Sequence, residues 1–111
     1  MNIELHKGWF NTTVPSFVAN LRMQEPNPAV AFVHVDLDLY SSTVDGLGPL
    51  ARAGMLVPGT VILFDEYFGW PGWDAAGAGE AAAWRDICAE HGIAWRHVLA
   101  YKQRMVVEVV E

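Results

Sequence analysis

Acidic residues follow two apolar segments of the chain at the point where each segment ends. Asp36 and Asp38 close the segment VAFVHVDLD, and Asp65 and Glu66 close the segment GTVILFDE. As adjacent strands of a parallel sheet, the two segments would lie about 4.8 Å apart and bring these carboxylates together. Their repulsion favours a hard divalent cation such as Mg²⁺. Acids at strand ends also cap helices or face solvent. Two such ends on successive strands favour a site, because ligands of open α/β sheets bind there.

His34 lies two residues before Asp36 and four before Asp38. Alternating side chains of a strand point to opposite faces, so these three residues share one face. Histidine titrates near neutral pH, which makes His34 a candidate general base, and Asp38 is a second candidate. The alternative for His34 is a hydrogen-bonded core residue, and for Asp38 a turn or cap residue.

A glycine-rich loop directly follows the second acidic pair. Trp70 and Trp73 lie within residues 68–79, which include four glycines and one proline, and Tyr67 immediately precedes the loop. Such a loop is predicted to overhang the acidic cluster and to form a lid or wall for an organic substrate. Equally, its aromatic side chains could anchor the loop to the core.

Strand and helix patterns alternate along the chain. Strands are expected at residues 3–7, 30–38, 59–66, 93–101 and 104–110. A first helix is capped by Thr12 or Thr13 and ends before Pro26, and a second is capped by Ser41, Ser42 or Thr43. A third spans residues 80–91 and ends at Gly92. This order predicts an α/β fold: a mostly parallel sheet with helices on both faces and a C-terminal antiparallel hairpin.

Composition narrows the class of protein further. The chain has 111 residues, 52% of them hydrophobic and 18% charged, which indicates one folded domain. Its net charge of −6 argues against a nucleic-acid partner. No apolar run approaches the roughly 20 residues of a membrane span, and the first residues lack a signal-peptide pattern. The single Cys88, predicted to be buried and inert, suits a reducing compartment, so a cytoplasmic location is expected.

Three segments resemble the macrocin O-methyltransferase family, which comprises class I S-adenosylmethionine-dependent enzymes that modify macrolide sugars. They are KGWFNTTVP at residues 7–15, HVDLDLYSST at residues 34–43, and PGT at 58–60 continuing to FDEY at 64–67. The resemblance implies a partial Rossmann-like sheet and Mg²⁺-dependent transfer of a methyl group to a hydroxyl of a small molecule, a sugar or natural product. The metal would act as a Lewis acid on that hydroxyl.

The resemblance also implies roles for individual residues. The implied metal ligands are Asp36, Asp65 and Glu66; the cofactor contacts are Lys7, Gly8, Trp9 and His34; the substrate contacts are Tyr67, Trp70 and Trp73. Catechol-type relatives use a lysine as base shortly after the first acid, where this chain has Leu39. The base is therefore left between His34 and Asp38.

The family's first two strands and its glycine-rich cofactor loop have no counterpart in the chain. Residues 1–111 therefore read as a single domain, the C-terminal portion of a methyltransferase fold, from a truncated or split enzyme. Two alternatives are a metal-dependent glycosyltransferase-like domain and a non-catalytic α/β fragment that associates with a partner. Orphaned strand edges predict a homo-oligomer or association with a complementary chain.

Overall fold

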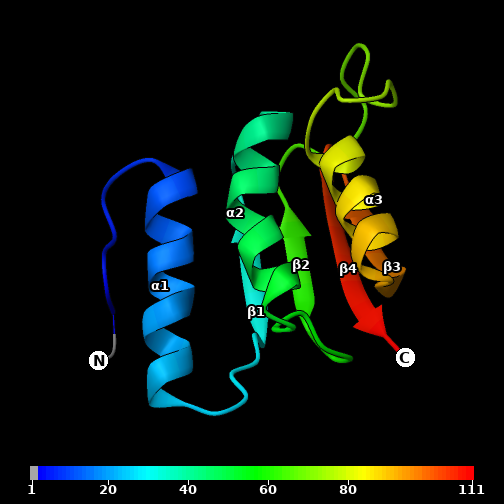
Figure 1. The fold of residues 1–111 in the computed structure, drawn as a ribbon. Helices are drawn as coiled ribbons and strands as arrows, with labels where there is room; N and C mark the ends of the chain where they lie inside the picture. The colour runs from blue at the N-terminus through cyan, green and yellow to red at the C-terminus, as the bar shows by residue number, and fades with distance from the viewer. Residues whose placement is uncertain (1–2) are drawn as a thin grey trace.

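The computed structural model describes residues 3–111 (Figure 1). Within these residues the chain forms three helices and four strands, in the order α1 (Phe10–Gln24), β1 (Phe32–Val35), α2 (Tyr40–Arg52), β2 (Val61–Phe64), α3 (Glu80–His91), β3 (Ala94–Tyr101) and β4 (Arg104–Val110). The α/β class predicted from the sequence is confirmed. No helix in this part of the chain is long and apolar enough to cross a membrane.

The four strands form one sheet in the order β1-β2-β4-β3. β1 and β2 are parallel, with Val35 opposite Phe64. The β2–β4 and β3–β4 pairs are antiparallel, which confirms the predicted C-terminal hairpin. The described sheet is thus less parallel than predicted, with one parallel pairing of three. The cause is that the hairpin supplies two of the four strands, and β4 pairs with β2 as well as with β3.

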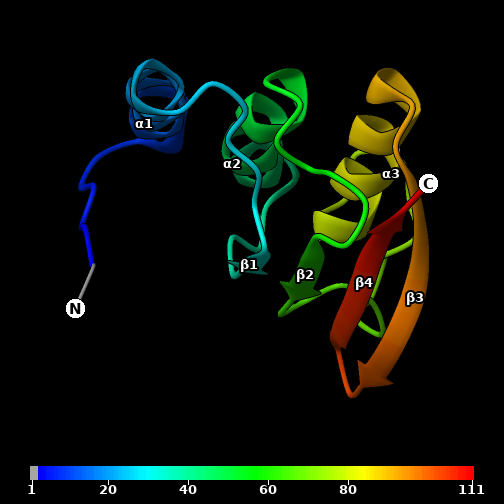
Figure 2. The same cartoon turned by 90° about the horizontal axis from the view of Figure 1, so that it is seen from below.

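α2 and α3 lie on one face of the sheet, and α1 lies on the same side, next to α2 and beyond the β1 edge, where the sequence predicted helices on both faces (Figure 2). The physical reason is the direction of the chain. Because crossovers are right-handed, successive helices stay on one face of the sheet as long as the chain moves across it in one direction. Here the chain moves in one direction from β1 to β2 and on to the β3–β4 hairpin, so the helices between these strands share a face. The helix-covered face buries Val35, Ile62 and Val107, whereas Phe32 on the other face is 57% exposed.

The N-terminal segment differs from the prediction in two respects. Residues 3–7 form no strand, because no strand pairs with them in the described structure. α1 begins at Phe10, earlier than a Thr12 or Thr13 cap would allow, and its N-cap Trp9 makes no side-chain cap bond. The Thr13 hydroxyl donates instead to the Trp9 carbonyl.

The start of α2 shows the same pattern. Its N-cap is Leu39, again without a side-chain cap bond, and not Ser41, Ser42 or Thr43. The Thr43 hydroxyl donates to the Leu39 carbonyl four residues earlier. In both helices a threonine therefore bonds backward from inside the first turn, as helical threonines commonly do. α3 spans the predicted residues and ends at Gly92, whose φ of 65° lies in the left-handed region.

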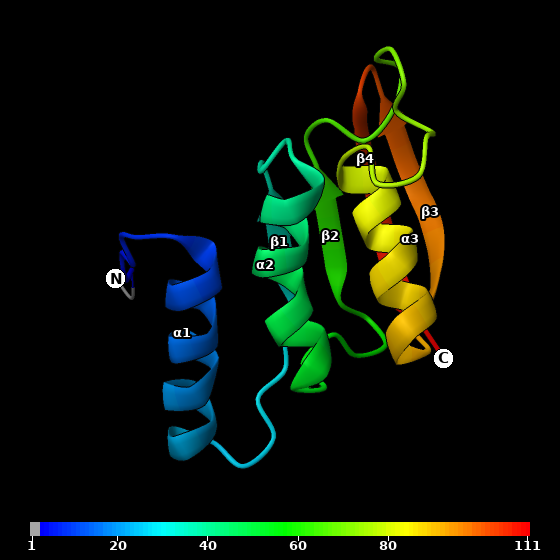
Figure 3. The same ribbon diagram turned by 45° about the horizontal axis from the view of Figure 1, so that its top comes forward.

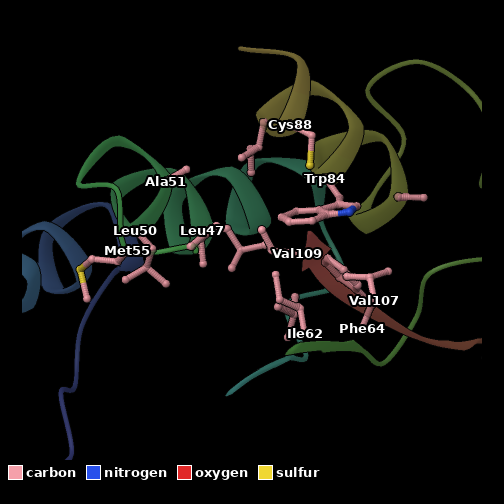
Figure 4. Close-up of a cluster of buried hydrophobic side chains, with 14 of the residues drawn as sticks. Leu47, Leu50, Ala51, Met55, Ile62, Phe64, Trp84, Cys88, Val107 and Val109 are labelled. Carbon is pink, nitrogen blue, oxygen red and sulfur yellow. The ribbon is translucent and has the colours of Figure 1, made fainter. Parts of the chain in front are cut away.

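The hydrophobic core lies between the helices and the covered face of the sheet (Figure 4). Trp84 of α3 is fully buried and packs against Phe64, with ring centroids 5.6 Å apart. Cys88 is buried as predicted, and burial raises the pKa of its thiol to about 12. Buried Thr60 accepts from the Val57 N–H and donates to the Val30 carbonyl, which ties the entry of β2 to the entry of β1.

Candidate active site at the carboxyl ends of β1 and β2

The carboxyl ends of β1 and β2 lie side by side at one end of the molecule. The backbone N–H of Asp65 donates to the Val35 carbonyl at 2.9 Å, so Asp36 and Asp65 leave neighbouring strands at the same level. α1, α2 and α3 all begin at this end (Figures 1 and 3). The parallel register therefore brings the two predicted acidic segments to one edge of the sheet, where helix N-termini favour negative charge.

Asp65 is paired with two basic side chains. Its Oδ1 accepts from Arg104 Nε at 3.1 Å and lies 3.7 Å from His34 Nε2. The His34 side chain is 49% exposed, so it is not the core histidine of the alternative interpretation. Arg104 was missed in the sequence, because only the pairing of β4 with β2 brings it to Asp65. Ion pairs that are this exposed stabilise the fold by less than about 1 kcal/mol. They matter here because they lie at the acidic edge of the sheet.

Glu80 is the functional-site residue that sequence reasoning missed most clearly. Its side chain is fully buried at the start of α3. Oε2 accepts from the N–H groups of Leu37 and Asp38 at 3.1 and 3.0 Å, and Oε1 accepts from the Glu66 N–H at 3.0 Å. Burial raises the pKa of Glu80, while these three N–H donors act in the opposite direction. A single carboxylate thus joins the turns that follow β1 and β2.

Asp38 adopts an unusual backbone conformation at this junction. Its φ is 60°, in the left-handed region that aspartate tolerates better than most residues. The Leu39 N–H donates to the Leu37 carbonyl at 2.6 Å, which tightens the turn around Asp38. Asp38 is therefore a turn residue, as the alternative interpretation proposed, and it is also exposed at the candidate site. Its catalytic role stays a prediction.

The aromatic residues of the 68–79 loop make packing contacts. Trp70 Nε1 donates to the Glu66 carbonyl at 3.2 Å, and the Trp70 ring lies against Gly79. Trp73 packs edge-on against Phe68, and Tyr67 is buried against Phe64. These contacts anchor the loop beside the acidic edge. The predicted substrate role of Tyr67, Trp70 and Trp73 is a separate property, which packing contacts do not test.

Two hollows are lined by residues of the β3–β4 hairpin together with residues that follow β2. One of about 270 Å³ is lined by Asp65, Glu66, Lys102, Gln103 and Arg104. The other, of about 370 Å³, has Tyr67, Phe68, Trp73, Trp95 and Met105 in its lining. The first is charged; the second is mainly aromatic and also includes Arg85 and His97. Met105 of the second hollow pairs with Phe64 on the helix-covered face, and the preceding Arg104 of the first hollow points to the other face.

The predicted cofactor residues Lys7, Gly8 and Trp9 are exposed, and Trp9 is 84% exposed. The segment that carries them, residues 3–9, runs along the side of α1 away from α2, whereas β1 lies on the other side of α1 (Figures 1 and 3). A hollow of about 770 Å³ between the N-terminal segment and α1 is lined in part by Phe10 and Phe17. The structure brings the acids together at one edge but does not bring this segment to them.

The predicted metal ligands Asp36, Asp65 and Glu66 offer carboxylate oxygens, the donor type that Mg²⁺ prefers. Within residues 3–111, however, no three His, Cys, Asp or Glu side chains are grouped closely enough to hold a metal ion. Asp65 is instead paired with Arg104. The chemistry of the donors therefore fits Mg²⁺, whereas in the described residues the side chains are not gathered around one point, since Asp65 is held by Arg104.

The sheet contains a parallel β-α-β crossover, is lined by a row of helices and carries acids at its strand ends. Together these features define a partial Rossmann-like α/β fold. Among solved structures, the chain is similar to the apo form of a TDP-rhamnose 3′-O-methyltransferase, an enzyme in calicheamicin biosynthesis. The TM-score is 0.64 and the sequence identity 25%, over 92% of this chain. No family model and no curated protein matches. The chain thus has the fold of part of a sugar O-methyltransferase and spans 39% of that structure's length.

Proposed function

We propose that the chain is the C-terminal portion of an S-adenosylmethionine- and Mg²⁺-dependent O-methyltransferase of the macrocin type, which methylates a hydroxyl of a sugar or natural product. The observation that carries this proposal is the structural similarity to a sugar O-methyltransferase over 92% of the chain. The acids at the carboxyl ends of β1 and β2 support it, because they occupy the edge where α/β sheets bind ligands. The single free and buried Cys88 suits a reducing compartment, and we propose a cytoplasmic location.

In this proposal S-adenosylmethionine would supply the methyl group. Asp36, Asp65 and Glu66 would hold Mg²⁺, which would supply Lewis-acid activation of the hydroxyl. The general base is His34 or Asp38. His34 is half-exposed, and its Nε2 lies 3.7 Å from Oδ1 of Asp65, a carboxylate that can orient the imidazole. That pairing is the structural support for His34 as the proton acceptor.

The acceptor is proposed to bind at the aromatic loop. Tyr67 and Trp73 line the hollow of about 370 Å³ beside the acidic edge, and Trp70 is held against the Glu66 carbonyl. Sugars present apolar C–H faces that pack on aromatic rings, and their hydroxyls bind charged groups. Asp65 and Glu66, which directly precede Tyr67 in the chain and line the charged hollow, supply such groups. Lys7, Gly8 and Trp9 are proposed to contact the cofactor.

Calorimetry tests the proposal on the purified chain. We expect S-adenosylmethionine to bind, and Mg²⁺ to bind with an affinity that falls at least tenfold in Asp65→Asn. Asp74→Asn is the matched control, because Asp74 is an exposed aspartate of the neighbouring loop. Absence of binding of either ligand by the folded chain would overturn the proposal for this chain. Binding of a UDP-sugar in place of S-adenosylmethionine would favour the glycosyltransferase-like alternative.

Association with a complementary or identical chain is a second proposal, compatible with the first. β1 is an edge strand with no further neighbour in residues 3–111, and its Phe32 is 57% exposed. An open parallel edge with an exposed aromatic side chain favours pairing with another strand. Sedimentation should show an assembly larger than 12.3 kDa that Phe32→Lys dissociates. A stable monomer of the unaltered chain would contradict this association.

A further inference from the structure

We infer that Glu80 is a positioning residue, which fixes the turn after β1 against the turn after β2 and thereby sets the spacing of the acids that these turns carry. This inference deepens the proposed function and depends on it for the identity of the site. That Glu80 joins the two turns does not depend on the proposed function, because its hydrogen bonds to both turns are present in the structure.

Both oxygens of Glu80 are used, and their donors come from two distant parts of the chain. Oε2 accepts from Leu37 and Asp38, which precede Glu80 by 43 and 42 residues, and Oε1 accepts from Glu66, which precedes it by 14. The three donors are backbone N–H groups, so the bonds locate the main chain of each turn and not only a side chain. A fully buried carboxylate with three charge-assisted bonds holds its partners in narrow geometry.

The bonds of Glu80 are not those of an ordinary helix cap. Glu80 is the first residue of α3, and the N-cap residue of this helix is Gly79, which has no side chain to cap it. All three bonds recorded for the Glu80 carboxylate go to residues outside α3. The positive end of the helix favours a carboxylate at this position, which offsets part of the cost of burying it. The helix therefore serves as a rigid base from which Glu80 reaches both strand ends.

The consequence for the site is clearest at Asp38. The Asp38 N–H donates to Glu80, and the residue is held at a φ of 60°. Left-handed conformations of residues other than glycine persist where surrounding contacts over-determine them. Without the Glu80 carboxylate, this turn is free to relax, and Asp36 and Asp38 would move relative to Asp65. Glu80 thus acts through the backbone and needs no contact with a substrate.

Amide hydrogen exchange tests the role of Glu80 directly. Glu80→Gln keeps the shape, but an amide has one acceptor oxygen, so its NH₂ must face one set of backbone donors. We expect the amide oxygen to keep its bonds from the Leu37 and Asp38 N–H groups and the NH₂ group to face the Glu66 N–H. The Glu66 amide, left without an acceptor, should exchange at least tenfold faster than in the unaltered chain. Glu80→Ala should accelerate all three amides. The control is Glu90→Gln, the same chemical change at an exposed position of the same helix.

The comparison with other amides separates positioning from general loss of stability. Amides of the β1–β2 ladder should keep their protection in Glu80→Gln, whereas general destabilisation would accelerate them as well. Unchanged exchange at Leu37, Asp38 and Glu66 would overturn the inference, as would a uniform change over the whole chain. If Glu80→Ala does not fold, Glu80→Gln still decides the question.

A Mg²⁺ titration of the same variants links Glu80 to the proposed site. We expect Glu80→Gln to bind Mg²⁺ at least tenfold more weakly than Glu90→Gln, although neither residue is a proposed ligand. Equal Mg²⁺ affinities of Glu80→Gln and Glu90→Gln would overturn the inference that Glu80 sets the spacing of the acids. Absence of Mg²⁺ binding by the unaltered chain would instead overturn the metal part of the proposed function, and hydrogen exchange would still decide whether Glu80 positions the two turns.

Discussion

Gly79→Ala should strain the junction between the aromatic loop, the Asp38 turn and α3. A Cβ atom at Gly79 would lie 2.7 Å from Cζ2 of Trp70 and 3.3 Å from the Asp38 carbonyl oxygen. Gly79 has a φ of 175°, which is extended backbone that any residue adopts. The expected penalty is therefore steric, and it arises from the indole ring and the backbone of the site.

The size of the penalty follows from two contributions. Overpacking of this kind costs about 1–3 kcal/mol. Replacing glycine by alanine at an N-cap adds up to about 1 kcal/mol. Together they predict a loss of about 1–4 kcal/mol in the free energy of unfolding. Trp70→Phe removes the clashing part of the ring, so in that background the N-cap cost and the weaker contact with the Asp38 carbonyl oxygen should remain. The two substitutions should therefore couple by up to about 3 kcal/mol.

Urea unfolding of the four proteins of this double-mutant cycle, followed by far-ultraviolet circular dichroism, measures the coupling. Gly77→Ala is the control. Gly77 has a φ of 71° and no atom within 4 Å of its Cβ position, so its penalty is conformational, about 1 kcal/mol, and should not couple to Trp70. An equal loss from Gly79→Ala in both backgrounds would refute the steric reasoning.

Further outcomes are expected at three residues. Thr60→Val should cost about 1–3 kcal/mol in urea unfolding, because the buried Val57 N–H and Val30 carbonyl lose their partner, whereas Thr60→Ser should keep most of the stability. Burial raises the pKa of Cys88 from 9.0 to about 12, so iodoacetamide at pH 8 should alkylate it only in denaturant, as mass spectrometry can check. Because the unfolded thiol ionises first, the Cys88 contribution should lower the free energy of unfolding as pH rises from 9 to 12. Arg104→Gln should cost less than about 1 kcal/mol, and less still at high salt; a larger loss would mean that its pair with Asp65 is not a surface pair.

Several elements of the fold were predictable because their signals are local. α3 lies where its alanine-rich pattern and the following Gly92 predicted it, and the hairpin of β3 and β4 follows from two apolar runs joined by a short turn. The position of Asp36 and Asp65 at one edge was also predictable, since parallel strands end at the same edge. In each case the prediction depends on the residue pattern within one or two short segments of the sequence.

The predictions that differed concern contacts between distant segments. A strand at residues 3–7 needs a neighbour, and none is present in the described residues. The threonine caps were wrong because a hydroxyl can bond backward inside a helix as readily as forward at its start. Helices on both faces would have required a reversal of strand order, which no local pattern reports.

The amino-acid sequence by itself determined the α/β class, the C-terminal hairpin and the acidic strand ends, because periodicity, glycine position and residue type act over a few neighbours. Only the tertiary structure decided that the described helices share one face, that Arg104 reaches Asp65, and that Glu80 joins the two turns. Those features depend on which strands pair and on where a helix begins in space. A buried carboxylate is stable only where enough donors converge on it, and here three donors come from two separate turns.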